Sequence, residues 1–267
     1  MNDNHNHSHS HSHAGLPAAH AHPHAHDGEP TGDDHWVHLE HLHFRYPDGT
    51  EALRGIDMHI ARGEKVALLG PNGAGKSTLM LHLNGIHRPT HGSVRVAQMN
   101  VSDETIGRVR AEVGLVFQDP DDQLFSPTVW EDVAFGPIHM GLDDAAVHDR
   151  VEAALAAVGA LDLAARPPMR LSIGQRKRVA LATVLSMEPS ILVFDEPSAG
   201  LDPRGRRELI ELLGTLNQTL IVSTHDLQLA RAAFPRSIVM GGGRIVADAS
   251  TETLLDDHAL LLQHGLA

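Results

Sequence analysis

The stretch Gly70-Pro71-Asn72-Gly73-Ala74-Gly75-Lys76-Ser77-Thr78 follows an apolar run at 65–69 and precedes a segment with helical spacing that extends to Ile86. Glycine lets backbone amides turn inward around an anion, and a helix that begins there presents the positive end of its dipole. Lys76 adds a cation, and the Ser77 hydroxyl is a suitable ligand for Mg²⁺. This strand–loop–helix arrangement predicts a phosphate-binding loop formed by residues 70–78.

A second stretch, Ile191-Leu192-Val193-Phe194-Asp195-Glu196, ends in two carboxylates. Its apolar part predicts a buried strand that delivers both carboxylates to its carboxyl end, the edge where open α/β sheets bind ligands. Asp195 is expected to help hold Mg²⁺, directly or through water, and Glu196 to polarise an attacking water. Together with the phosphate loop, the two carboxylates indicate a Mg²⁺-dependent phosphate site.

Strand-like and helix-like segments alternate along the chain. Apolar alternation and short apolar runs predict strands at 37–44, 52–60, 65–69, 113–117, 191–194 and 220–222. Helical spacing predicts helices at 77–86, 144–158, 175–186 and 203–216. Two further short strands, 238–240 and 245–247, flank Gly241-Gly242-Gly243 and predict a hairpin with a permissive turn. The predicted fold class is α/β, with a P-loop core, an antiparallel β portion near the start and a helix-rich middle.

The amino-acid composition favours one class of fold and argues against several classes of function. The 267 residues are 42% hydrophobic but only 3% aromatic, which is typical of helix-flanked sheets with aliphatic cores. The formal net charge of −13 argues against a nucleic-acid partner, which requires a basic surface to displace counterions. The absence of cysteine excludes disulfides, thiolate metal sites and cysteine nucleophiles.

The sequence contains no segment that predicts a membrane span. Its longest run without charged or polar side chains is about nine residues, 153–161, whereas a spanning helix needs roughly twenty. No Lys or Arg precedes Arg45 and no apolar h-region is present, so a secretory signal is not predicted. The expected location is the cytoplasm.

Histidines are concentrated near the N-terminus, where thirteen of the 22 lie at or before His43. Residues 1–35 alternate His with Ser, Asn, Ala and Pro and have almost nothing apolar to bury, which predicts a disordered tail. This tail carries five acidic and no basic residues, so it contributes −5 of the net charge. Its candidate transition-metal ligands are His5, His7, His9, His11, His13, His20, His22, His24 and His26.

With these motifs in this order, the chain resembles the nucleotide-binding subunit of ATP-binding cassette (ABC) transporters over about residues 36–250. Leu171-Ser172-Ile173-Gly174-Gln175 is similar to the family signature Leu-Ser-Gly-Gly-Gln, with Ile173 in place of the first glycine. The resemblance implies that Ser172 and the backbone at Gly174 contact the γ-phosphate of ATP held by a second subunit. Taken alone, the motif would indicate a helix N-cap at Ser172.

Four more residues match family motifs by their position. The resemblance implies that Gln118 is the Q-loop glutamine, which senses Mg²⁺ and the attacking water, and that His225 is the switch histidine, which reaches the γ-phosphate. Asp202 matches the D-loop that crosses the dimer interface. Tyr46 lies 24 residues before Gly70, where the family places an adenine-stacking aromatic; a surface aromatic at a strand end is the alternative.

The resemblance implies two composite ATP sites between two subunits, with in-line attack of water on the γ-phosphate. Catalysis is then charge neutralisation by Lys76 and Mg²⁺ and positioning by Glu196, Gln118 and His225. The implied Mg²⁺ ligands are Ser77, Gln118 and Asp195. The expected organisation is a tail at 1–35, an ABC ATPase domain at 36–250 with a helical subdomain at about 119–186 that carries the signature, and a C-terminal helical extension at 251–267.

The segment after Gln118 is similar to a narrower group of ATPases. Residues 117–125 read Phe-Gln-Asp-Pro-Asp-Asp-Gln-Leu-Phe and residues 128–137 read Thr-Val-Trp-Glu-Asp-Val-Ala-Phe-Gly-Pro. Both resemble the ATPases of energy-coupling factor (ECF) importers for cobalt, nickel and vitamins. The resemblance implies a peripheral subunit at the cytoplasmic face of the membrane, with a second ATPase subunit, a transmembrane coupling protein and a membrane substrate-binding subunit as partners. A segment that packs the helical subdomain of any cassette ATPase is the alternative.

The His-rich tail is the feature that bears on the substrate. Neutral imidazole suits Ni²⁺, Co²⁺, Cu²⁺ and Zn²⁺ and is a poor ligand for Mg²⁺ or Ca²⁺. The sequence therefore favours import of cobalt or nickel, with the tail as a metal buffer or sensor. A zinc or vitamin importer, an exporter cassette, and a tail that is only a solubilising linker or an affinity tag are the alternatives. A soluble cassette ATPase of translation or DNA repair is disfavoured, because the chain has one cassette and only about 95 residues between Lys76 and Leu171.

Overall fold

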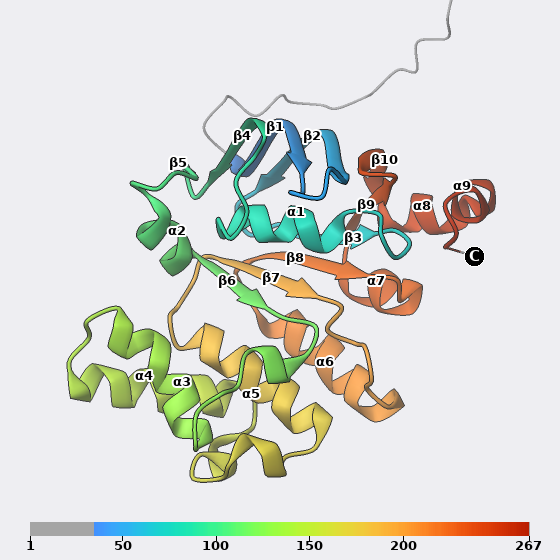
Figure 1. Ribbon diagram of the computed structural model, residues 1–267. Helices are drawn as coiled ribbons and strands as arrows, with labels where there is room; N and C mark the ends of the chain where they lie inside the picture. Colours follow the sequence, from blue (N-terminus) through green and yellow to red (C-terminus); the bar gives the residue numbers. More distant parts are fainter. Residues whose placement is uncertain (1–34, 267) are drawn as a thin grey trace, which may run out of the picture. The chain divides into compact units, whose positions relative to one another are not determined.

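The computed structural model describes residues 35–266, so the predicted ligands His5 to His26 lie outside the described residues. The six-stranded sheet consists of β3 (Lys65–Leu69), β6 (Val113–Val116), β7 (Ile191–Asp195), β8 (Thr219–Thr224), β9 (Arg236–Gly241) and β10 (Arg244–Ser250). The four-stranded sheet consists of β1 (His35–Arg45), β2 (Glu51–Ala61), β4 (His91–Val96) and β5 (Met99–Asn100). Figure 1 shows the two sheets, with β1, β2 and β4 at the top.

The larger sheet has the strand order β10-β9-β3-β8-β7-β6. Neighbouring strands from β9 to β6 run parallel, and only β10 pairs antiparallel, with β9. The smaller sheet is antiparallel, with β1 between β2 and β4, which confirms the predicted antiparallel portion near the start. Because the carboxyl ends of parallel strands meet at one edge, the segments that follow β3, β6, β7 and β8 converge there.

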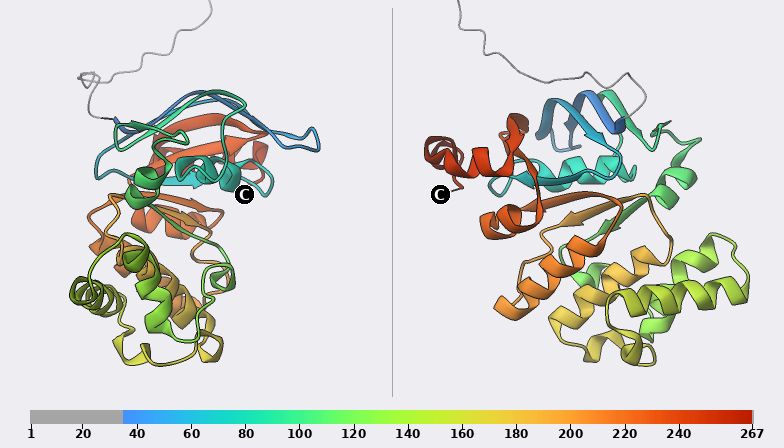
Figure 2. Two further views of the ribbon diagram at one scale, coloured as in Figure 1. Left: turned by 60° about the vertical axis from the view of Figure 1, so that its left-hand side comes forward. Right: turned by 180° about the vertical axis from the view of Figure 1, so that it is seen from behind.

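Helices cover both faces of the larger sheet. The α-helices are α1 (Lys76–Leu83), α2 (Ile106–Glu112), α3 (Val129–His139), α4 (Asp144–Ala157), α5 (Ile173–Leu185), α6 (Pro203–Thr215), α7 (Leu227–Ala233), α8 (Thr251–Asp256) and α9 (His258–Gln263). The short 3₁₀ turns are η1 (Pro120–Asp122), η2 (Leu161–Leu163) and η3 (Pro168–Arg170). Figures 1 and 2 show α1 between the two sheets, and α5 and α6 on the opposite side of the larger sheet. No helix among residues 35–266 has the length and apolar character needed to cross a membrane.

Alternate residues of the larger sheet enter two separate apolar cores. In β3, Val66 and Leu68 pack in the core shared with α1 and the four-stranded sheet. Ala67 and Leu69 pack in the core shared with α5, α6 and α7. Both faces of the sheet are therefore buried, as expected for parallel strands flanked by helices.

Two predicted helix boundaries differ from the structure by two residues or more, for local reasons. The helix predicted over 77–86 ends at Leu83, because Asn84 terminates it and Gly85 follows with a φ of +69°. The helix predicted over 175–186 begins at Ile173, because Ser172 and Gln175 form a capping box. Gln175 Oε1 accepts from the Ser172 amide at 2.9 Å, and the Gln175 amide donates to Ser172 Oγ at 3.3 Å. Ser172 therefore serves as an N-cap in this structure.

Candidate functional site

The loop between β3 and α1 surrounds the Lys76 side chain. Lys76 Nζ donates to the carbonyls of Gly70, at 2.7 Å, and Pro71, at 3.2 Å. Gly70 leaves no room for a side chain, since a Cβ there would lie 2.5 Å from the Met240 carbonyl oxygen. Burial lowers the pKa of Lys76, and the nearby Glu196 and Asp195 oppose this shift. The loop thus holds a largely desolvated cation at the sheet edge.

Glu196 follows β7 at the same edge and is only 6% exposed. Its Oε2 lies 2.9 Å from Nδ1 of His225, the residue after β8. Its Oε1 accepts no hydrogen bond and lies 3.8 Å from Lys76 Nζ. The structure therefore brings the predicted base, the phosphate-loop lysine and the switch histidine into one group, although they are distant in sequence.

The backbone at Glu196 adopts an uncommon conformation. Its φ is +47°, in the left-handed region that residues other than glycine seldom occupy. The Glu196 amide donates to the Ser223 carbonyl at 3.0 Å and to Ser223 Oγ at 3.3 Å. Ser223 Oγ also donates to the Asp195 carboxylate. Ser223 of β8 therefore supports both carboxylates at the end of β7.

A cavity of about 540 Å³ opens beside these residues, and its volume is in the range of small-molecule sites. The predicted site residues that line it are Tyr46, Asn72, Gly73, Ala74, Gly75, Lys76, Ser77, Thr78, Gln118, Asp195, Glu196 and His225. Gly70 and Pro71 contribute through their carbonyls to Lys76 instead. Tyr46 lies at the cavity wall with its hydroxyl 3.0 Å from Thr78 Oγ1, and its ring contacts Phe44 edge-on.

The side chains at this edge suit Mg²⁺ chemically. Ser77, Gln118 and Asp195 provide a hydroxyl, an amide and a carboxylate in the same cavity, and Mg²⁺ prefers such oxygen ligands. The buried Glu196 Oε1 without a hydrogen-bond partner faces this region as well. Mg²⁺ in nucleotide sites is held by one or two carboxylates together with phosphate oxygens, so few protein ligands are needed. Within residues 35–266, no three His, Asp or Glu side chains form a ready metal-binding group of their own.

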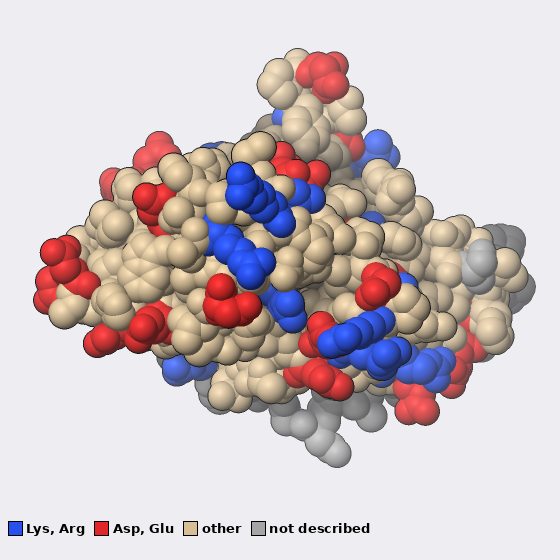
Figure 3. Space-filling model, turned by 90° about the horizontal axis from the view of Figure 1, so that it is seen from below, with Lys and Arg blue, Asp and Glu red and all other residues tan. Residues whose placement is uncertain are grey.

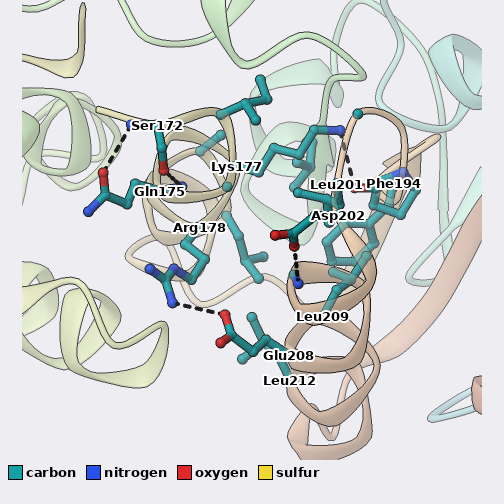
Figure 4. Close-up of a pocket in the computed structure, with 18 of the residues that line it drawn as sticks. Ser172, Gln175, Lys177, Arg178, Phe194, Leu201, Asp202, Glu208, Leu209 and Leu212 are labelled. Atoms are coloured by element: carbon teal, nitrogen blue, oxygen red, sulfur yellow. Dashed lines mark hydrogen bonds and ion pairs between the residues drawn. The ribbon is translucent and has the colours of Figure 1, made fainter. Parts of the chain in front are cut away.

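The predicted signature and D-loop line a different cavity, of about 590 Å³ (Figure 4). Ser172, Gly174 and Gln175 lie at one side of it, at the start of α5. Asp202 lies at the other side, where its carboxylate accepts from the Gly205 amide at 2.7 Å and caps α6. Leu171 is 6% exposed and packs in the core instead of lining this cavity.

Several residues of the nucleotide-sized cavity were not predicted from the sequence. These are Thr50, Glu51, Ala52, Arg54, Gly242 and Gly243. They come from the end of the β1–β2 turn, the start of β2 and the β9–β10 hairpin, which the fold brings to the phosphate loop. The Gly243 amide, for example, donates to the Ala74 carbonyl at 3.1 Å. The glycines of the hairpin were the available signal, but a permissive turn alone does not indicate a ligand.

The face that is seen when the molecule of Figure 1 is viewed from below carries charges of both signs. Figure 3 shows Lys and Arg side chains there in groups that border Asp and Glu side chains. Helices α5 and α6 take part in ion pairs, namely Arg176 with Asp121, and Arg178 and Arg204 with Glu208. On this face, basic and acidic side chains therefore alternate.

Comparison with known proteins gives relatives along most of the chain. A putative ABC transporter ATP-binding protein of Streptomyces avermitilis is 55% identical over 225 residues, which cover 84% of this chain and 86% of that protein. The energy-coupling factor transporter ATP-binding protein EcfA of Carboxydothermus hydrogenoformans is 49% identical over 233 residues, 86% of each chain. The solved structure of cbiO1 from Clostridium perfringens, described as part of the ABC transporter complex cbiONQ, superposes with a TM-score of 0.77. It has 40% identity and covers 88% of this chain and 96% of its own.

The model of the ABC transporter family matches residues 53–199, which include the phosphate loop, the signature and the carboxylates that follow β7. The matched fold and the geometry of the two cavities agree with this result. The chain therefore belongs to the ABC transporter family, as an ATP-hydrolysing, ATP-binding component of a transporter of the ABC/ECF type.

Proposed function

We propose that Mg-ATP binds in the 540 Å³ cavity and that Glu196 is the base for its hydrolysis. The observation that carries this proposal is the placement of Glu196, whose buried carboxylate lies between Lys76 Nζ and His225 Nδ1. A buried carboxylate at the carboxyl end of a strand, beside a phosphate loop, is in position to orient a water for in-line attack.

The other residues have distinct proposed roles. Amides of the loop 70–78 and the start of α1 bind the β- and γ-phosphates, and Lys76 neutralises their charge. Ser77, Gln118 and Asp195 would hold Mg²⁺, which supplies further charge neutralisation when bound. His225, whose Nδ1 lies 2.9 Å from Glu196 Oε2 and whose side chain is 65% exposed, would contact the γ-phosphate. Tyr46, which lines the cavity, would stack on adenine.

The substitution Glu196→Gln tests the role of Glu196. The amide keeps the size of the side chain but cannot accept a proton, so ATP affinity should be retained while turnover falls by about two orders of magnitude or more. Equilibrium binding of a fluorescent ATP analogue and steady-state phosphate release measure the two effects separately. Turnover close to that of the wild type would sink the proposal.

We further propose that two subunits form the complete site. Ser172, Gly174 and Gln175, with Leu171 supporting them from the core, would face the γ-phosphate bound by the other subunit, and Asp202 would cross the interface. Support comes from the structure of the single chain, whose signature and phosphate loop line different cavities. The second subunit is either another copy of this chain or a paralogue.

For the transported substrate, we propose cobalt or nickel, imported by an ECF-type complex on whose cytoplasmic side this subunit works. A transmembrane coupling protein and a membrane substrate-binding subunit are the expected partners. The proposal is supported by the similarity to EcfA and to cbiO1 of the cbiONQ complex, and by the imidazole-rich tail. Import of zinc or a vitamin is the alternative. Uptake of labelled cobalt, nickel and zinc by cells that express the transporter set separates these substrates.

The tail is proposed to bind transition metals through His5, His7, His9, His11, His13, His20, His22, His24 and His26. Calorimetric titration of Ni²⁺, Co²⁺ and Zn²⁺ into the full chain and into a full-length variant with these nine residues changed to Asn is the direct test. The wild type should bind more metal, and its affinity should weaken below about pH 6.5, because protons compete for imidazole nitrogen. Equal binding by the two proteins would remove the tail from the proposal.

A further inference from the structure

We infer that Lys177 is a positioning residue that clamps the peptide carrying Glu196 from the signature helix α5. The inference rests on the proposed role of Glu196 as the base. Lys177 Nζ donates to the carbonyl of Pro197 at 3.1 Å and, more weakly, to that of Glu196 at 3.4 Å. Figure 4 shows the Lys177 side chain extending from α5 to this backbone across the top of the cavity.

The hydrogen bonds from Lys177 help to stabilise an unfavourable backbone conformation at Glu196. Glu196 has a φ of +47°, so without external contacts its backbone would relax to an ordinary region. The amide side of Glu196 is held by the Ser223 carbonyl, at 3.0 Å, from the neighbouring strand β8. The carbonyl side is held by Lys177. Relaxation on either side would turn the carboxylate away from Lys76 and His225.

Lys177 differs from the two arginines that flank it on α5. Arg176 pairs with Asp121 of η1 at 3.4 Å, and Arg178 pairs with Glu208 of α6 at 3.5 Å. These are ion pairs between side chains on exposed or half-buried surfaces. Lys177 instead donates to main-chain oxygens of the segment that carries Glu196.

Lys177 is partly removed from solvent but has two carboxylates nearby. Burial lowers the pKa of its ammonium group, while Asp119, next to Gln118, and Glu196 oppose the shift. An ammonium group also matches two adjacent carbonyls, because it has three donors and no acceptor. The first turns of α5 thus carry the signature on one side and a direct hydrogen bond to the catalytic segment on the other. A movement of α5 would reach Glu196 through a single side chain.

The test compares Lys177→Met and Lys177→Arg with the matched control Lys65→Met. Lys65 Nζ also donates to two adjacent carbonyls, Leu213 at 2.8 Å and Gly214 at 3.2 Å, but lies at the start of β3, away from the cavity. We expect Lys177→Met to lower kcat about tenfold, equivalent to about 1.4 kcal/mol in activation free energy, with KM for ATP nearly unchanged. Lys177→Arg should recover most of kcat, and Lys65→Met should leave kcat unchanged.

Three results would overturn the inference. They are a kcat for Lys177→Met within twofold of the wild type, an equal loss in Lys177→Met and Lys65→Met, or no recovery in Lys177→Arg. Thermal melting accompanies each assay, and Lys177→Gln replaces the Met variant if the latter does not fold. Glu196→Gln is measured in parallel. If its turnover is normal, the proposed role of Glu196 is wrong. If Glu196→Gln is inactive but Lys177→Met has normal kcat, only the inferred role of Lys177 is wrong.

Discussion

Lys76 is the first residue of the short helix α1 and His82 is its next-to-last residue. Burial lowers the pKa of both. Lys76 keeps charged partners, since Glu196 and Asp195 lie nearby. His82 is fully buried against Phe44, and its Nδ1 lies 2.7 Å from the Thr78 carbonyl oxygen. Its Nε2 has no partner, and burial lowers its pKa to about 4. Lys76 thus serves the anion site, whereas His82 is a neutral side chain in the core.

The pKa of His82 predicts acid sensitivity of the fold. The unfolded chain takes up a proton at His82 below about pH 6.5, but the folded chain does so only near pH 4, so stability is lost as the pH falls through this window. Between pH 7 and pH 5 the loss from His82 is about 2 kcal/mol. The variant His82→Leu should therefore show a smaller difference in unfolding free energy between these two pH values, measured with urea. His258→Leu, at an exposed site on α9, should keep the wild-type difference; equal behaviour of both variants would contradict the prediction.

At the residue scale, the site residues that belong to sequence motifs could be predicted, whereas the residues that act through tertiary contacts could not. Lys76, Glu196 and His225 could be predicted because each follows a strand of the same parallel sheet, so topology alone brings them together. Neither the support of Glu196 by Ser223 nor the reach of Lys177 to Pro197 could be predicted in this way. Both depend on which side chains face each other across a strand pair or a helix–loop contact.

At the scale of elements, the prediction succeeded where burial imposes a strong pattern. β3, β7 and β8 are almost fully buried and read as apolar runs. By contrast, β4 buries only two of its residues and α2 only Val109, so neither has a periodic signal. The two-residue strand β5 is too short to give any pattern.

The packing of α5 on β6 gives a prediction at this scale. A Cβ on Gly114 of β6 would lie 2.1 Å from Val184 Cγ1 of α5, so Gly114→Ala should overpack this contact and cost about 1–3 kcal/mol of unfolding free energy. Gly107 of α2 faces open space, so Gly107→Ala should instead stabilise the protein by roughly 0.5–1 kcal/mol through helix propensity. Urea unfolding of both variants measures the contrast, and destabilisation of similar size in the two would count against it.

At the scale of the whole molecule, the two parts of the proposed ATP site lie in different cavities of the single chain. The phosphate loop lines the cavity of about 540 Å³ and the signature the cavity of about 590 Å³, and no lining residue belongs to both. A single chain therefore does not bring its own signature to its own phosphate loop. This separation is the physical reason to expect that a second subunit completes each site.

The last prediction concerns the association of two subunits through ATP. In a Glu196→Gln background, which should bind ATP without consuming it, the chain is expected to form a dimer with Mg-ATP in size-exclusion chromatography with light scattering. Adding Gly174→Asp should abolish this dimer but leave ATP binding intact, because the new carboxylate would repel the partner's γ-phosphate. The position tolerates a side chain, since a Cβ there meets only Leu201 Cδ2, at 3.8 Å. Gly107→Asp is the matched control, as Gly107 and Gly174 are each the second residue of a helix, and it should keep the dimer. An ATP-dependent dimer that survives Gly174→Asp would show that the signature does not contact the nucleotide of the partner.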